Sequence, residues 1–360
     1  MHGWLLGLAV LLSDPLLPSA PVLPTRLEPP AVAQIMEIPA PLRQALRERV
    51  AARRADQLTQ LGALVAFLFD ERGMHLSYDD DATLTVAEAW EHRVANCLTF
   101  TLVTVALARE LGIEAYGQDL PDTLIWRQED RTLYHATHVN AGVWIGRRRF
   151  SVDVASERVL THQAPRRLED ARLLAQFYNN RSVELMAAQH LDAALVHSQL
   201  ALGLDKGYPT TWNNTGVVHL RAGRMAEAER FYRQAVALDP EHGSALSNLV
   251  NLLERQGNPA LALPFRARLH AAQQRNPFHH FLNGLNLEQQ QRYAEAIASY
   301  KRAIQLWDGE HRFHFGLARA YYLSGRKGPA SRALERARTR SSGPTRHKYE
   351  AKLAALQRRR

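Results

Sequence analysis

The sequence predicts an α+β N-terminal domain followed by an all-α solenoid of repeated helix pairs. Two observations lead to this prediction. From residue 175 onward, small residues recur with a period of 34, which is typical of stacked helix pairs. Before residue 170, one long apolar segment precedes several short runs of strand character, as in a sheet packed against a helix.

Length and composition fit this two-part architecture. The 360 residues are enough for roughly two to three domains of about 150 residues each. Hydrophobic residues make up 46% of the chain and charged residues 22%, which excludes a fibrous or wholly disordered protein. The single cysteine excludes an intrachain disulfide framework.

The net charge of +9 is concentrated at the C-terminus. Residues 326–360 hold 12 Lys or Arg and 2 acids, whereas the rest of the chain is nearly neutral. We therefore expect no nucleic-acid partner. The basic tail is interpreted as the solvated face of a terminal helix, and an anionic partner is the alternative.

Residues 1–25 form a signal-like apolar segment and the start of a proline-rich tether that continues to about residue 41. The apolar run at residues 4–12 has the length of a secretory signal core and is shorter than the roughly 20 residues that cross a bilayer. We expect export, to the periplasm, with a cytoplasmic protein as the alternative. No transmembrane helix is predicted.

Residues 42–68 show apolar positions at helical spacing and predict one long or two shorter amphipathic helices. The three consecutive carboxylates Asp79, Asp80 and Asp81 are interpreted as a turn, because no second set of cation ligands accompanies them.

The segment from Cys97 to Leu111 is apolar nearly all round and is followed by Gly112, which predicts a buried helix. The only thiol of the chain then lies in the first turn of this helix. Free backbone amides and the positive end of the helix dipole favour a thiolate there. Cys97 is therefore a candidate nucleophile, and a small buried hydrophobic residue is the alternative.

Strands are predicted at residues 115–120, 123–126, 136–145 and 149–154, with a two-residue hairpin turn at Gly146 and Arg147. Such a turn pairs residues whose numbers sum to 293, which sets Asn140 opposite Asp153. His138 then lies diagonally across on the same face, within reach of the Asp153 carboxylate. His135 falls on the other face, and no metal site is expected.

This order of Cys, His and Asp resembles the transglutaminase-like branch of the papain-like cysteine enzymes, over roughly residues 42–170. The resemblance implies that Cys97 is the nucleophile, His138 the base and Asp153 the residue that orients the imidazole. Asn96 is a weak candidate for the oxyanion site. The segment from Arg93 to Gly112 is most similar to bacterial members that carry this domain before helical repeats. No cofactor is implied.

In the C-terminal half, the 34-residue frame begins at residues 175, 209, 243, 277 and 311. Small residues let the two helices of a pair approach closely, and glycine suits the turn between them. Position 20 is alanine in every copy, namely Ala194, Ala228, Ala262, Ala296 and Ala330. Position 15 is glycine or glutamine: Gln189, Gly223, Gly257, Gln291 and Gly325.

This pattern resembles the tetratricopeptide repeat, with five copies at residues 175–344 and a basic capping helix at residues 345–360. The resemblance implies a concave groove that holds a protein or peptide. Together, the two resemblances predict a transglutaminase-like cysteine hydrolase or acyltransferase that acts on protein or peptide amides, with the repeats recruiting a protein partner. The alternative is a protein-interaction scaffold with an inert transglutaminase-like domain.

Overall fold

The computed structural model describes residues 26–51, 56–120, 128–129, 132–133, 138–154 and 164–358. It divides into two compact units, Met1–Phe231 and Tyr232–Arg360, and the boundary falls inside helix α10 (Met225–Leu238). The signal-like segment at 1–25 and the predicted strand at 123–126 lie outside the described residues, so the export prediction stays untested.

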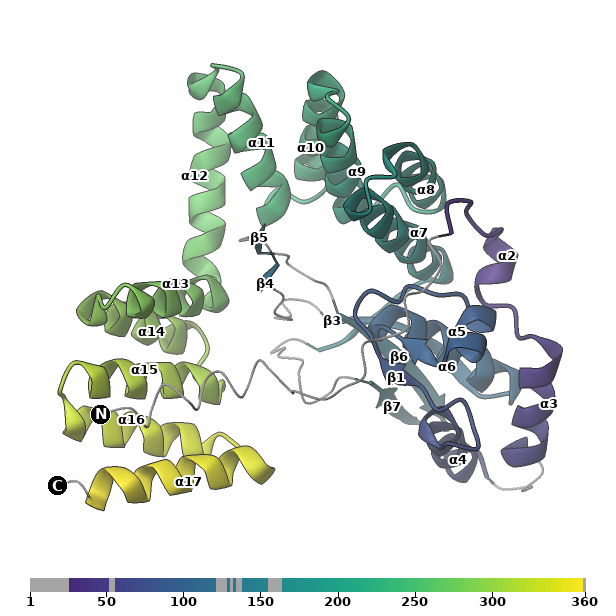
Figure 1. Ribbon diagram of the computed structural model, residues 1–360, viewed down its shortest axis with the longest axis horizontal. Helices are drawn as coiled ribbons and strands as arrows, with labels where there is room; N and C mark the ends of the chain where they lie inside the picture. Colours follow the sequence, from purple (N-terminus) through teal and green to yellow (C-terminus); the bar gives the residue numbers. More distant parts are fainter. Residues whose placement is uncertain are drawn as a thin grey trace. The chain divides into compact units, whose positions relative to one another are not determined.

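The first unit begins with short helices, labelled in Figure 1: α2 (Val32–Ile35), α3 (Ala40–Arg49), α4 (Gln57–Phe69) and α5 (Val86–His92). The region at 42–68 therefore forms two helices, the second of the alternatives predicted. Asp56 starts α4 by accepting hydrogen bonds from the backbone amides of Leu58 and Thr59. The apolar faces of α3 and α4 enter the core of the unit.

Helix α6 (Cys97–Glu110) confirms the predicted buried helix. Every residue from Leu98 to Ala108 is buried. After the helix ends, Gly112 adopts φ +72°, a left-handed conformation that glycine reaches without strain. Cys97 is the first helical residue and therefore lies at the N-terminal end of the most buried helix of the unit.

A four-stranded antiparallel sheet packs against α6, with strand order β7-β6-β3-β8. Its strands are β3 (Glu114–Leu120), β6 (His138–Ile145), β7 (Arg148–Val152) and β8 (Arg166–Arg167). In the β6–β7 hairpin, Ile145 pairs with Arg148 and Ala141 with Val152, so the predicted register is confirmed. Ala141, Val143 and Val152 belong to the same core as the apolar side chains of α6.

Two further strand pairs are only two residues long. β1 (Ser77–Tyr78) runs parallel to β2 (Val94–Ala95), the segment directly before Asn96 and Cys97. β4 (Gln128–Glu129) pairs with β5 (Thr132–Leu133). The β1–β2 pair fixes the approach of the chain to α6.

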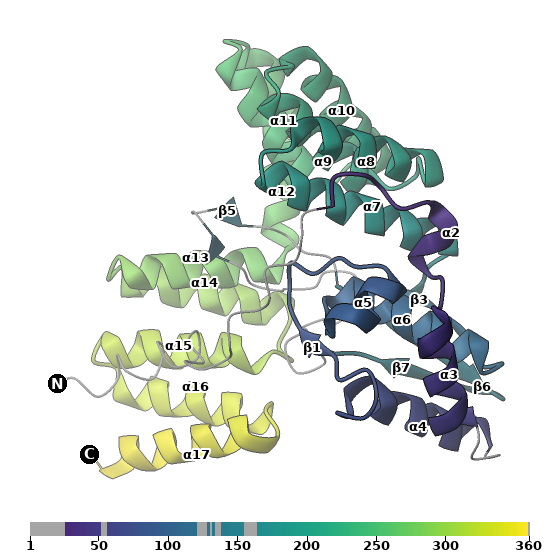
Figure 2. The same cartoon turned by 45° about the vertical axis from the view of Figure 1, so that its right-hand side comes forward.

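Ten helices, two for each predicted repeat, follow the sheet over residues 170–339. In the first unit these are α7 (Asp170–Ala187), α8 (Leu191–Leu204), α9 (Pro209–Arg221) and the start of α10. In the second unit they continue with α11 (Gly243–Arg255), α12 (Pro259–Arg275), α13 (Pro277–Gln289), α14 (Tyr293–Leu306), α15 (His311–Leu323) and α16 (Lys327–Thr339). Figure 2 shows α13 to α17 layered one on the next.

The 34-residue register is confirmed by backbone conformation and by burial. All five position-20 alanines have no exposed surface. All five residues at position 15 adopt a positive φ, between 61° and 80°, because the chain turns there from one helix of a pair to the next. The first copy differs, since α7 begins at Asp170 and not at residue 175. The added turn packs Leu173 close to Gly117 of β3, and Arg109 of α6 forms a bidentate ion pair with Asp170.

Two glycines of successive copies, Gly284 at position 8 and Gly316 at position 6, make room for the Tyr300 ring. A Cβ atom built on Gly284 or Gly316 would lie 2.6 Å or 2.7 Å from the Tyr300 ring, so both glycines are required by this packing. In the first copy, Ser182 and Ser198 replace this arrangement with a buried hydrogen bond of 2.7 Å between their hydroxyls.

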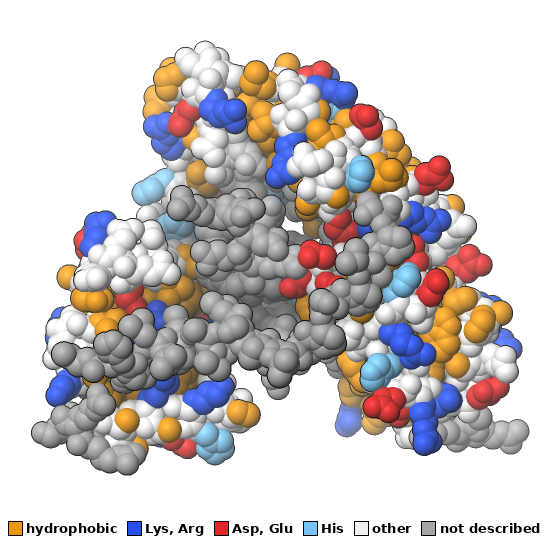
Figure 3. Space-filling view, in the orientation of Figure 1, with side chains coloured by type: hydrophobic (Ala, Val, Ile, Leu, Met, Phe, Trp, Pro, Cys, Tyr) orange, Lys and Arg blue, Asp and Glu red, His pale blue; other side chains and the backbone are white. Residues whose placement is uncertain are grey.

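Helix α17 (Gly343–Arg358) follows the last pair and begins two residues before the predicted cap. Tyr349 and Leu356 are buried, and the Tyr349 ring stacks on Phe315 with centroids 5.2 Å apart. Part of the basic charge is paired, since Arg338 bonds both Glu335 and Glu350. Figure 3 shows other Lys and Arg side chains along this end of the chain. Within the described ranges, each helix lacks the length or the apolar character that a bilayer crossing requires.

Candidate functional site

The candidate site is the cluster of Cys97, His138 and Asp153, which the structure brings together in the first unit. Cys97 opens α6, His138 opens β6, and Asp153 directly follows β7. The hairpin register carries Asp153 to the position opposite Asn140, as predicted. The three residues therefore come from a helix start and two adjacent strand ends.

Asn96 holds the helix start that carries Cys97. Its Oδ1 accepts a hydrogen bond from the Thr99 amide at 2.8 Å, which makes it the N-cap of α6. Its Nδ2 donates to Thr83 Oγ1 at 2.8 Å. Both ends of the Asn96 amide are thus engaged, Oδ1 by the cap and Nδ2 by Thr83. This favours a positioning role over the predicted oxyanion role. Cys97 itself is a free, half-buried thiol.

His138 is fully buried and bound to Asp153. Its Nε2 lies 2.8 Å and 3.0 Å from the two Asp153 oxygens. In the neutral ring, the Nε2 proton donates to Asp153 and Nδ1 keeps a lone pair that can accept the thiol proton. Nδ1 makes no hydrogen bond to a nitrogen or oxygen of the described part of the chain, so it is the ring atom left for Cys97.

The charges around His138 favour its protonated form. Burial lowers the pKa of His138, but hydrogen bonds and negative charge from Asp153 and Cys97 outweigh it and raise the pKa to about 9. A side-chain interaction between Cys97 and the His138 ring is one of these causes. The ring can therefore take the thiol proton and stabilise the resulting thiolate.

Asn140 is a second partner of Asp153, and no role was predicted for it from the sequence. Its Nδ2 donates to Asp153 Oδ2 at 3.0 Å, so the carboxylate is fixed from two residues of β6. The signal was present in the sequence, because the predicted register already placed Asn140 opposite Asp153. Thr83, the partner of Asn96, carried no comparable signal.

Of the other residues considered as metal ligands, those that the structure describes form no metal-binding group. His135 lies outside the described residues, and among those described there is no group of three or more His, Cys, Asp or Glu side chains arranged for a metal ion. Asp79 accepts a hydrogen bond from the Asp81 amide, as expected for a turn. No cofactor is needed for the chemistry of the cluster.

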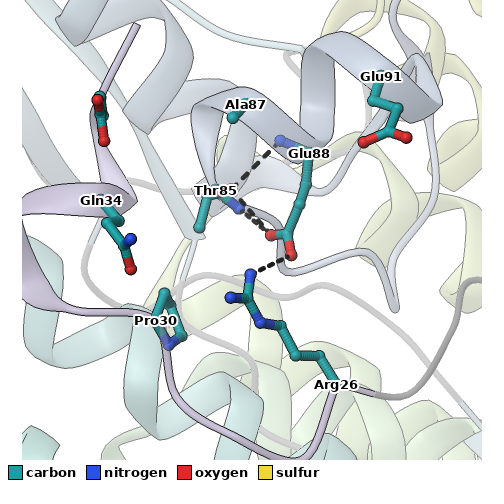
Figure 4. Close-up of a pocket in the computed structure, with 8 residues that line it drawn as sticks. Arg26, Pro30, Gln34, Thr85, Ala87, Glu88 and Glu91 are labelled. Carbon is teal, nitrogen blue, oxygen red and sulfur yellow. Dashed lines mark hydrogen bonds and ion pairs between the residues drawn. The ribbon is translucent and has the colours of Figure 1, made fainter. Parts of the chain in front are cut away.

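A pocket of about 290 Å³ lies elsewhere in the first unit, between the segment before α2 and helix α5. Figure 4 shows Arg26 directed at Glu88, which it bonds at 3.2 Å, while Glu88 also closes the capping box of Thr85. Its lining includes Gln34 and Glu91 and none of the three clustered residues. This pocket therefore reflects how the N-terminal segment is held on α5.

Comparison with known proteins identifies the repeats. One tetratricopeptide-repeat family model matches residues 209–242 and a second matches residues 287–352. The C-terminal region of the chain therefore contains tetratricopeptide repeats, and repeats of this family bind proteins or peptides. Neither match reaches residues 42–170, and no curated protein matches the chain.

The solved structures that are similar to part of the chain include two tetratricopeptide-repeat proteins and MamA. YrrB, described as a repeat protein with an unusual peptide-binding site, is 21% identical, with 49% of this chain and 92% of YrrB covered and a TM-score of 0.27. MamA is 18% identical over 46% of this chain and 91% of its own, with a TM-score of 0.27. TTC0263 of Thermus thermophilus is 23% identical over 51% and 98%, with a TM-score of 0.28.

Proposed function

We propose that this protein binds a protein or peptide partner through its tetratricopeptide repeats. The observation that carries the proposal is the 34-residue register, supported by the two family matches, the five buried alanines and the five turns with positive φ. The comparisons favour this scaffold function over the enzymatic one predicted first. A protein or peptide in the groove is the partner that such repeats accommodate.

The groove can be tested on the first two pairs. Asn214 of α9 donates to Asn179 of α7 at 3.1 Å, so this position bridges the first helices of successive pairs. Gln199 of α8 is exposed on a second helix. We expect Asn214→Arg to abolish retention of a partner by immobilised protein, and Gln199→Arg to leave it unchanged. Equal retention by both variants would show that the partner does not use the groove.

A second function, thiol-dependent acyl transfer, is favoured by the Cys97, His138 and Asp153 cluster. The transglutaminase-like resemblance and the fixed His138–Asp153 pair support it. In this proposal the repeats present a protein whose amide reaches Cys97. Hydrolysis is the expected outcome, because water is always available as the acceptor.

The proposed reaction needs no redox partner. The Cys97 proton passes to His138 Nδ1 while Sγ forms a bond to the amide carbonyl carbon. The C–N bond then breaks, and His138 returns the proton to the leaving amine, which leaves a thioester. Water attacks the thioester and gives a proton to His138. The C–S bond breaks, the product leaves as a carboxylic acid, and His138 reprotonates the thiolate.

Alkylation of the single cysteine tests this second function. At pH 6 we expect iodoacetamide to react faster with the folded protein than with free cysteine, and His138→Ala to remove the difference. Intact mass reports the reaction, because Cys97 is the only thiol. If Cys97 reacts no faster than free cysteine and His138→Ala changes nothing, the domain is an inert part of a scaffold.

A further inference from the structure

The loop at residues 82–84 is fastened to the first turn of α6 on both sides of Thr83. The Thr99 hydroxyl donates to the Ala82 carbonyl at 2.9 Å, and it accepts from the Leu84 amide at 2.8 Å. Thr83 Oγ1 accepts from Asn96 Nδ2, so the loop also holds the N-cap side chain. Thr83, Asn96 and Thr99 are all buried. The loop and the turn that carries Cys97 therefore form one hydrogen-bonded structure.

Helix α7 of the first repeat reaches this structure through Glu184. The Thr83 amide donates to Glu184 Oε1 at 3.3 Å, across 101 positions of sequence. The other carboxylate oxygen, Oε2, accepts from Arg181 at 2.7 Å, and Arg181 also bonds the Arg26 carbonyl. A hydrogen-bonded path thus runs from Glu184 through Thr83 to Asn96, the residue directly before Cys97.

Apolar packing joins the same two elements. Leu98 and Leu102 of α6 lie in one buried cluster with Phe177 and Tyr178 of α7 and Ile35 of α2. The Tyr178 hydroxyl donates to the Pro30 carbonyl at 2.6 Å. Because α7 shares a core with α6, it cannot shift without disturbing the first turns of the nucleophile helix.

Glu184 has an unusual environment for a repeat residue. Burial raises its pKa to about 7, although Arg181 and Thr83 oppose the rise. Burying a carboxylate costs free energy unless its oxygens are hydrogen-bonded. The two oxygens of Glu184 each accept from one donor, the Thr83 amide and the Arg181 guanidinium.

We propose that Glu184 is a positioning residue for Cys97, which it controls through Thr83 and Asn96. The first repeat is then part of the thiol site and not only a module attached to it. The reactivity part of this inference rests on the proposed thiol function, whereas the positioning part does not.

The test compares Glu184→Ala with Glu184→Gln. The amide oxygen of glutamine can still accept from the Thr83 amide, so the conservative variant should retain the path. Asp192→Ala, an exposed acid on α8, is the matched control. Thr83→Val, which removes the hydroxyl that accepts from Asn96, is a second variant. It is used if thermal melting shows that Glu184→Ala does not fold.

Two readouts separate this inference from the thiol function. Hydrogen exchange of the peptide covering residues 96–101 should accelerate in Glu184→Ala and Thr83→Val, but not in Glu184→Gln or Asp192→Ala. The iodoacetamide rate of Cys97 should fall about fivefold in the same two variants, the factor that corresponds to weakening the Asn96 cap by about 1 kcal/mol. If wild-type Cys97 is not activated, the thiol function fails while exchange still tests the path. Unchanged exchange in folded Glu184→Ala and Thr83→Val overturns the inference.

Discussion

The Asp153 carboxylate sets the basicity of the His138 ring, and Asp153→Asn isolates that effect. The substitution keeps the size of the side chain but removes its charge, while His138 stays fully buried. The pKa of His138, about 9 against an ordinary 6.5, should then fall. Cys97 contributes part of the increase, so we expect a decrease of about 1 to 2 pH units, or ~1.4 to 2.8 kcal/mol of proton affinity.

The same decrease predicts the loss in thiol reactivity. The equilibrium constant for forming the thiolate–imidazolium pair falls tenfold for each unit by which the ring becomes less basic, so the iodoacetamide rate at pH 7 should drop by up to about 10- to 100-fold. Ser151→Ala is the matched control, because Ser151 lies on the same strand and bonds Gln118 instead of His138. Equal rates in wild type and Asp153→Asn would refute the reasoning.

Stability provides an independent check with a defined sign. The pKa of His138 is higher in the folded state than its ordinary 6.5, so this group's stabilisation is fully present below pH 6.5 and lost as pH rises through about 9. Asp153→Asn should therefore lower the melting temperature more at pH 6 than at pH 10. A constant difference between the two pH values would contradict the assigned pKa.

Two further predictions concern the repeats. Gly316→Ala should cost roughly 1 to 3 kcal/mol of unfolding free energy, because the new Cβ would meet the Tyr300 ring. Gly328→Ala is the control and should be neutral or stabilising, because the nearest atom to its new Cβ would lie 3.8 Å away. Denaturant unfolding of the two variants measures the difference. Gln291→Gly should raise the unfolding free energy by about 1 kcal/mol, because glycine adopts the φ of 61° at this turn without strain. Gly257→Gln, at the equivalent turn of another copy, should lower it by a similar amount. A lower melting temperature for Gln291→Gly would contradict this prediction.

The repeats and the β6–β7 hairpin could be predicted from the sequence because each depends on local rules. One turn position and one alanine position fix the 34-residue frame, and a two-residue turn fixes every pair of the hairpin. The pairing of His138 with Asp153 follows directly from that register. These features require no knowledge of distant residues.

The support of the Cys97 turn could not be predicted in this way. Glu184 meets Thr83 across 101 positions, and neither residue belongs to a periodic pattern that marks the contact. The early start of α7 has the same origin, because Asp170 and Leu173 extend the helix to contact α6 and β3. Contacts between different architectures leave no spacing signal in a single sequence.

The position of α7 has a consequence for how the chain can be divided. A cut at residue 170, the predicted end of the N-terminal domain, would separate Phe177 and Tyr178 from Leu98 and Leu102 and expose that apolar surface to water. The smallest autonomous fragment that retains an intact thiol should instead extend through the early helix pairs, in keeping with a compact unit that ends at Phe231. Limited proteolysis should release a fragment in which α7 stays joined to the sheet domain.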